Sequence, residues 1–289
     1  MLTESARAKV NLSLRVRGRR SDGYHDLESV VAFADCADRL TLEAGAELSL
    51  RITGPLAGAC GAVTDNLVLK AARLLAEAVP GLRVGAFALL KVLPVAAGIG
   101  GGSADAAAAL RLLARLNDLS MEDPRLHQVA LKSGADVPVC LLSRGSIMRG
   151  IGERIVALDV PEMACVMVNP RLPVATSAVF QALGLEKGTM RHDTDADRQD
   201  WPQQAAVSAW VAHLAGIAND LEAPAIAIQP VIGEVLEALG GSRGTLLARM
   251  SGSGATCFAI FADSDAASSA AANIAQAHPS WWVHAGSLR

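Results

Sequence analysis

Aromatic side chains are scarce in this sequence. Phenylalanine, tryptophan and tyrosine make up 3% of its 289 residues, and tyrosine occurs once. The core must therefore be built from aliphatic side chains, and 51% of the residues are hydrophobic. A chain of this length and composition can bury a large core, in one large domain or two ordinary ones, and an aliphatic core suits helices packed on sheets.

An excess of charge is also missing. The 26 basic and 29 acidic residues leave a net charge of −3, so there is no general electrostatic reason to bind nucleic acid or an anionic membrane. The N-terminal residues lack a signal-peptide core, and the uncharged stretch from Trp201 to Asn219 carries proline and polar residues typical of an amphipathic helix. We expect a cytoplasmic protein that binds neither membrane nor nucleic acid.

Paired cysteines are absent as well. The five cysteines form no CxxC pair, and most of them lie among apolar residues. This pattern predicts small buried side chains in a reducing compartment, and neither a disulfide framework nor a zinc site. The cysteines are Cys36, Cys60, Cys140, Cys165 and Cys257.

Alternating strands dominate the first ninety residues. Residues 9–19 place Val10, Leu12, Leu14 and Val16 on one face, and a turn at Asp22 precedes a second apolar strand. Residues 38–44 and 47–54 predict a hairpin, and residues 84–94 another strand.

Helical spacing begins at residues 66–79, where Asp65 or Asn66 is the expected N-cap, and later helices alternate with strands at 164–170 and 256–262. This irregular order favours an α+β fold over a doubly wound α/β fold. We expect domains at 1–155 and 156–289, and a polar insertion or lid at 186–204.

A glycine-rich loop, "PVAAGIGGGSADAAAAL", starts at Pro94 and runs into an alanine-rich helix. It fails both GxxxxGK[ST] and GxGxxG. Glycines nevertheless let successive N–H groups face one anion, and Ser103 is the expected cap of a helix that begins near Ala104. A flexible linker or packing turn is the alternative. We favour phosphate binding because the run joins elements that need only a short connection.

Four segments together resemble the GHMP kinases: this loop, residues 6–30, "SGADVPVC" at 133–140 and "MSGSGATCFAIF" at 250–261. The resemblance implies a two-lobed fold with the active site in the cleft between lobes, residues 1–155 binding ATP and residues 156–289 contributing to the substrate site. Asn66 would lie near adenine, unless it is only a helix cap. The implied phosphate-loop residues are Pro94, Val95, Ala96, Ala97, Gly98, Ile99, Gly100, Gly101, Gly102, Ser103 and Ala104.

Two residues are the expected catalytic pair. Asp136 is ordinarily a turn aspartate in Gly-Ala-Asp, and Lys9 an edge-strand lysine. The resemblance implies instead that Asp136 accepts the proton of the acceptor hydroxyl. It also implies that Lys9 lies beside Asp136 and offsets charge on the transferred phosphoryl group.

The substrate side rests on the resemblance too. It implies that Tyr24 stacks on a cytosine whose edge bonds to His25, and that Thr176 and Phe180 close the other side of that site. Asn11 shares a strand face with Lys9 and is included. A half-buried turn tyrosine, a histidine that is no ligand and a core phenylalanine are the plain alternatives.

The function implied is ATP-dependent phosphorylation of the 2-hydroxyl of a cytidine-diphosphate sugar alcohol, within the non-mevalonate route to isoprenoid precursors. Mg²⁺ would arrive with ATP, and the sequence points to no protein ligand for it. The rivals are another GHMP small-molecule kinase, such as homoserine kinase, and a non-catalytic nucleotide- or RNA-binding module. The Asp22-Gly23-Tyr24-His25 signature disfavours the first, and the net charge of −3 the second. We expect a monomer or weak homodimer.

Overall fold

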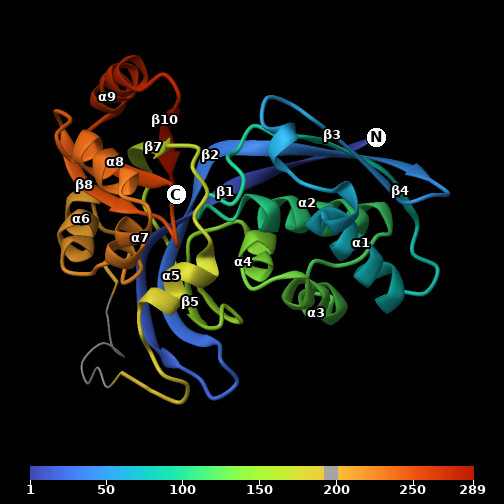
Figure 1. Cartoon of the computed structure of the whole chain (residues 1–289). Helices are drawn as coiled ribbons and strands as arrows, with labels where there is room; N and C mark the ends of the chain where they lie inside the picture. The colour runs from blue at the N-terminus through green and yellow to red at the C-terminus, as the bar shows by residue number, and fades with distance from the viewer. Residues whose placement is uncertain (192–200) are drawn as a thin grey trace. The chain divides into compact units, whose positions relative to one another are not determined.

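The computed structural model describes residues 1–191 and 201–289 (Figure 1). The chain forms two compact units, and each collects separate stretches of sequence. Unit 1 contains residues 1–9, 36–95 and 100–143, and unit 2 contains residues 10–35, 96–99 and 144–289. Two long strands, β1 (Leu2–Arg19) and β2 (His25–Gly45), supply residues to both. The linear boundary at 155/156 remains a prediction.

The sheet of unit 1 corrects the expected hairpin. Strand β4 (Val84–Leu90) lies between β3 (Ser49–Thr53) and the C-terminal half of β2, so β2 and β3 are not neighbours. β4 pairs antiparallel with β2 and parallel with β3. Parallel strands need a crossover, which α1 (Leu67–Ala78) provides. Alternation marked both strands, but it does not specify which partner a strand takes.

Helices α1, α2 (Gly101–Leu116), α3 (Pro124–Ser133) and α4 (Val137–Leu142) pack on one another in unit 1. Short helices η1 (Ala57–Ala59) and η2 (Val63–Asp65) precede α1. Helix α2 buries a run of alanines, and small side chains allow its neighbours to approach closely. Asn66 is the N-cap of α1, because its side-chain oxygen accepts the Val68 N–H at 2.9 Å.

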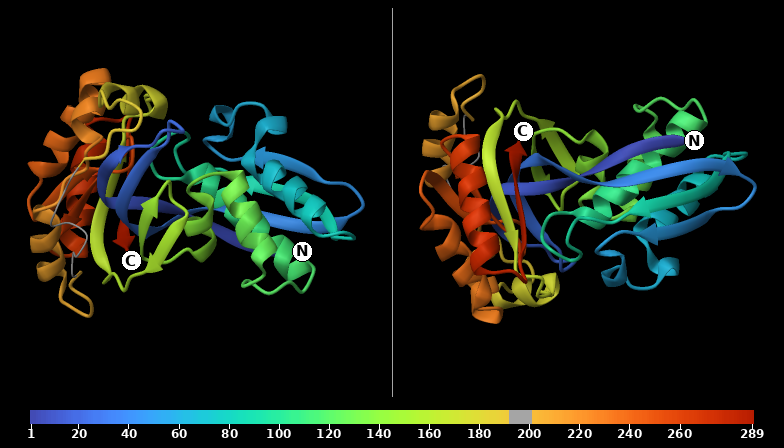
Figure 2. Two further views of the ribbon diagram at one scale, coloured as in Figure 1. Left: turned by 90° about the horizontal axis from the view of Figure 1, so that it is seen from below. Right: turned by 90° about the horizontal axis from the view of Figure 1, so that it is seen from above.

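Unit 2 contains an antiparallel sheet in the order β10-β7-β9-β8, with helices α8 (Val231–Gly240) and α9 (Ser264–Ala277) packed against it (Figure 2). Its strands are β7 (Met163–Asn169), β8 (Thr245–Met250), β9 (Cys257–Phe261) and β10 (Trp282–Leu288). The N-terminal half of β2 pairs with β5 (Ser146–Gly150), which pairs with β6 (Arg154–Ala157). Helices α5 (Thr176–Ala182), α6 (Val207–Ala215) and α7 (Glu222–Ile228) complete the unit. The mixture of helices and strands confirms the α+β class.

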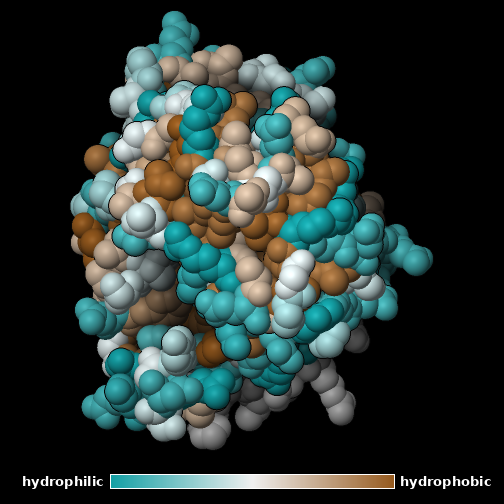
Figure 3. Space-filling view, turned by 90° about the vertical axis from the view of Figure 1, so that its right-hand side faces the viewer, coloured by the Kyte–Doolittle hydropathy of each residue, from teal (hydrophilic) through white to brown (hydrophobic). Residues whose placement is uncertain are grey.

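The stretch from Trp201 to Asn219 is helical only over α6. Residues 192–200 of the expected lid at 186–204 lie outside the described residues. Within the part of the chain that the structure describes, no helix has the length and apolarity needed to cross a bilayer. Apolar surface is interspersed with hydrophilic side chains on the face shown in Figure 3.

Candidate active site

The expected catalytic pair is present in unit 1. The Lys9 ammonium lies 3.0 Å from Asp136 Oδ2, and the Lys9 side chain is 4% exposed whereas that of Asp136 is 36% exposed. A buried ammonium thus faces a carboxylate that is still open to an incoming hydroxyl. Gly100, in the loop, is close to both: a Cβ added there would lie 3.4 Å from Lys9 Cε and 3.8 Å from Asp136 Oδ2.

The loop begins its helix earlier than expected. The N-cap of α2 is Gly100, with a φ of 62°, so Ser103 lies inside the first turn and is not the cap. The backbone angle decides this, because glycine adopts the left-handed conformation without strain. A Cβ on Gly101 would face Lys91 Nζ at 3.4 Å, whereas Gly102 is exposed and would meet only Leu67 Cδ1 at 3.6 Å. Of the loop glycines at positions 98, 100, 101 and 102, Gly102 is thus the exposed one.

The rest of the loop is divided between the units. Residues 96–99 belong to unit 2, and Pro94, Val95 and residues 100–104 belong to unit 1. Val95 and Ala96 are exposed, whereas Ala97, Ile99 and Ala104 are buried. The buried members fix the loop in the protein, and the exposed members reach solvent.

A buried charge cluster next to α2 was not expected from the sequence. Lys91 Nζ lies 2.6 Å from both Asp38 Oδ2 and Asp105 Oδ2, and all three side chains are at most 3% exposed. Asp38 Oδ1 also accepts the N–H groups of Val92 and Leu93, but Asp105 Oδ1 is buried with no partner among the described residues. Burial raises the pKa of Asp105 to about 7, against the opposing effect of Lys91. The only signals were one lysine in an apolar strand and one aspartate in an alanine-rich helix.

The turn after β8 supports the loop within unit 2. Ser251 Oγ donates to the Gly98 carbonyl at 2.9 Å and accepts the Asn11 N–H at 3.0 Å. The Thr256 N–H donates to the Ala97 carbonyl at 3.1 Å. Gly98 has a φ of 76°, and a Cβ there would lie 2.8 Å from Gly254 N. This second small-residue turn therefore requires glycine at position 98.

Asn11 is almost fully buried and has one unused oxygen. Its Nδ2 donates to Ser29 Oγ at 2.7 Å, and Ser29 in turn donates to the Ser13 carbonyl at 2.6 Å. Because the Ser29 hydroxyl already donates its hydrogen to the Ser13 carbonyl, it can only accept from Asn11, so the nitrogen of the Asn11 amide must face Ser29. Asn11 Oδ1 is left buried without a partner among the described residues, which suits an acceptor for a ligand donor.

Two of the residues expected to bind the base, His25 and Phe180, are in contact in unit 2. The rings of His25 and Phe180 stack with centroids 4.6 Å apart, and His25 Nε2 is buried with no partner in the described part of the chain. Burial, helped by Arg19, lowers the pKa of His25, which favours a neutral ring. Tyr24 is 62% exposed at the turn. Thr176 begins α5, and its hydroxyl lies 2.9 Å from that of Ser253.

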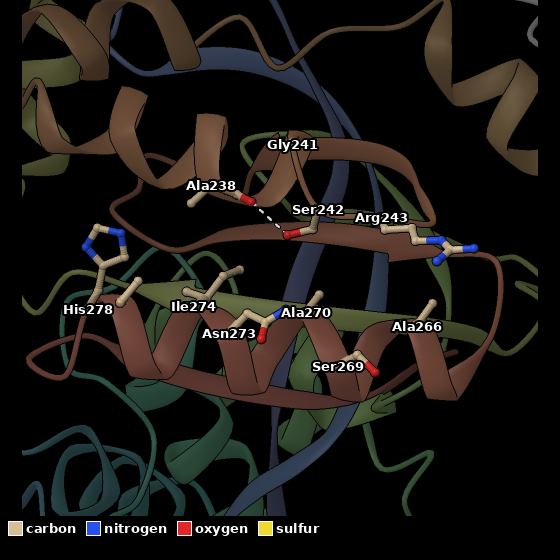
Figure 4. Close-up of a pocket in the computed structure, with 11 residues that line it drawn as sticks. Ala238, Gly241, Ser242, Arg243, Ala266, Ser269, Ala270, Asn273, Ile274 and His278 are labelled. Atoms are coloured by element: carbon tan, nitrogen blue, oxygen red, sulfur yellow. Dashed lines mark hydrogen bonds between the residues drawn. The ribbon is translucent and has the colours of Figure 1, made fainter.

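A separate hollow of about 340 Å³ lies between the end of α8 and α9 (Figure 4). Four of the 11 residues that line it are alanines, and the hydrogen bond drawn there, from Ser242 Oγ to the Ala238 carbonyl at 2.8 Å, joins two residues of its wall. None of the residues expected in the active site lines this hollow.

Known proteins resemble the chain over its whole length. The model of the GHMP kinases N terminal domain matches residues 66–144, and that of the GHMP kinases C terminal matches residues 204–280. The 4-diphosphocytidyl-2-C-methyl-D-erythritol kinase of Bradyrhizobium diazoefficiens is 67% identical, covering 99% of this chain and 98% of that protein. The protein of the same name from Rhodopseudomonas palustris strain BisB18 is 66% identical, covering 99% and 95%.

Solved structures of GHMP kinases are also similar to this chain over nearly its whole length. A crystal structure of 4-(cytidine 5'-diphospho)-2C-methyl-D-erythritol kinase superposes with a TM-score of 0.76 at 35% identity, covering 99% of both chains. Homoserine kinase from Cytophaga hutchinsonii has a TM-score of 0.65 at 19% identity, covering 98% of this chain and 93% of that one, which shows a shared fold alone.

Proposed function

Because this chain belongs to the GHMP kinases, we propose that it transfers the terminal phosphoryl group of ATP to the 2-hydroxyl of 4-(cytidine-5'-diphospho)-2-C-methyl-D-erythritol. The observation that carries this proposal is the full-length 67% identity to a curated kinase of that name. The chain is a small-molecule kinase, and the step belongs to non-mevalonate isoprenoid precursor synthesis. We place the reaction in the cytoplasm and expect a monomer or weak homodimer, which sedimentation would test.

The chemistry assigned to unit 1 is proton removal and charge compensation. Asp136 would accept the proton of the acceptor hydroxyl, and Lys9, held 3.0 Å from it, would stabilise negative charge that develops on the transferred group. The glycine loop suits a triphosphate, because Gly102 is exposed in the first turn of α2, where backbone N–H groups lack helical partners. Mg²⁺ would enter bound to the nucleotide and neutralise its phosphate oxygens.

The specificity assigned to unit 2 is for cytosine. A neutral His25 can donate to or accept from the edge of the base, and its buried Nε2 lacks any other partner among the described residues. An unpartnered buried nitrogen beside an aromatic ring is the combination that a base would complete. Tyr24, Phe180, Thr176 and Asn11 are proposed to line the same subsite.

The test is a coupled assay of ADP release with the cytidine-diphosphate sugar alcohol and, in parallel, with homoserine. We expect ADP release with the first and none above background with the second. Rapid turnover of homoserine without turnover of the cytidyl compound would overturn the proposal. Homoserine kinase shares the fold at 19% identity, which makes it the informative comparison.

A further inference from the structure

Residues 219–222 lead from the connection after α6 into the first residue of α7, and they lie between β1 and the turn after β8, all within unit 2. The backbone of this segment pairs with β1, because the Leu14 N–H donates to the Ala218 carbonyl at 3.3 Å and the Asp220 N–H donates to the Leu14 carbonyl at 2.8 Å. Asp220 Oδ2 also accepts the Val16 N–H at 2.8 Å. The segment is thereby fixed to a strand of the core.

The other side of the segment holds the turn. Asn219 is 5% exposed, and its Nδ2 donates to the carbonyls of Met250 and Gly252, both at 2.8 Å. Its Oδ1 accepts the Leu221 N–H at 3.0 Å. Glu222 Oε2 accepts the Met250 N–H at 2.8 Å. Both N–H groups of the Asn219 side-chain amide donate to the turn and its oxygen accepts from Leu221, so no other residue type of this size makes the same set of bonds.

The turn held in this way is the one that supports the loop. Between the two carbonyls that Asn219 binds lies Ser251, whose hydroxyl donates to the Gly98 carbonyl at 2.9 Å. We propose that Asn219 is a positioning residue for ATP: it acts through Ser251 on Gly98 and so sets the backbone of the phosphate loop. This inference rests on the proposed use of ATP. The Asn219 side chain itself is bonded to the backbone of Met250, Gly252 and Leu221.

The test measures the dissociation constant of ATP by calorimetry in the full chain, so it does not depend on turnover or on the identity of the acceptor. Asn219→Asp keeps the size of the side chain but sets an oxygen against two carbonyls. The variant loses both hydrogen bonds from Nδ2 to the turn, and only part of that loss reaches the loop, so we expect an ATP dissociation constant about tenfold higher. Asn273→Asp, on exposed α9, is the matched control and should leave it unchanged.

Two further variants separate positioning from stability. Asn219→Ser retains one hydrogen-bond donor, and its ATP dissociation constant is measured instead if Asn219→Asp does not fold. Ser251→Ala breaks the link to Gly98, so the double variant with Asn219→Ser should weaken ATP binding by less than the product of the single effects.

Wild-type ATP affinity in a folded Asn219 variant, or fully multiplicative effects, would overturn the inference. Wild-type protein that binds ATP but does not phosphorylate the cytidyl compound would refute the proposed acceptor and leave this inference standing.

Discussion

Asp136→Asn is the sharpest test of the catalytic assignment. The substitution keeps the shape of the side chain and an oxygen that can accept from Lys9, but it removes the base. General base catalysis contributes roughly 10²–10⁴ in rate, so kcat should fall by that factor, or about 3 to 5 kcal/mol in barrier height. ATP affinity should stay near the wild-type value.

The stability effect should be much smaller. Lys9 is buried and loses a charged partner, but Asp136 is 36% exposed, and solvent screens a pair of this kind. We expect a loss of about 1 kcal/mol at most, which would lower Tm by no more than roughly 2–4 °C. Steady-state ADP release at saturating levels of both substrates, together with thermal unfolding, separates the two effects.

Glu4→Gln is the matched control, because the Glu4–Arg111 pair in the same unit has the same 3.0 Å separation but no assigned role in catalysis. Its kcat should equal that of the wild type. Near-normal kcat in Asp136→Asn would refute the assignment of the base. An equal loss in Glu4→Gln would show that a general weakening of unit 1 explains the effect.

Three further variants test other parts of the site. Gly98→Ala should weaken ATP binding and lower Tm, because a φ of 76° is strained for alanine and the added Cβ would collide with Gly254 N. Gly58→Ala is the control, since a Cβ at Gly58 meets no atom within 4 Å. It should change neither ATP binding nor Tm. His25→Phe keeps the stack on Phe180 but should raise the KM for the cytidyl substrate roughly tenfold, with the KM for ATP unchanged. A wild-type KM for the cytidyl substrate would refute the role of His25 in binding the base. The pKa of Asp105 is raised from 3.8 to about 7 in the folded protein. The folded state therefore binds the Asp105 proton more tightly than the unfolded state does, which stabilises the fold at low pH. This stabilisation is complete below pH 3.8 and is lost as the pH rises through 7. Asp105→Asn should therefore show a smaller fall in Tm than the wild type between pH 5 and pH 8, and parallel curves would contradict the assignment.

Local patterns were sufficient for most elements. Helix α1 begins and ends close to the expected residues, because its N-cap, Asn66, lies next to it in the sequence. The pairing of β2 with β3 was wrong, because alternation marks a strand but the partner depends on a crossover through α1. The cap at Ser103 was wrong for a similar reason: the left-handed backbone at Gly100 decides where α2 starts.

The sequence by itself determined the chemistry available to this protein. It has a glycine run ahead of an alanine-rich helix, a single lysine, Lys9, in the first strand, and Asp136 two residues before Pro138. The tertiary structure pairs Lys9 with Asp136, 127 residues away, at 3.0 Å, which the resemblance implied but local spacing did not. It also decided that Lys91 is buried between two carboxylates and that Asn219 holds the turn beneath Gly98. These contacts depend on strand pairing and helix packing between distant segments, which local spacing does not encode.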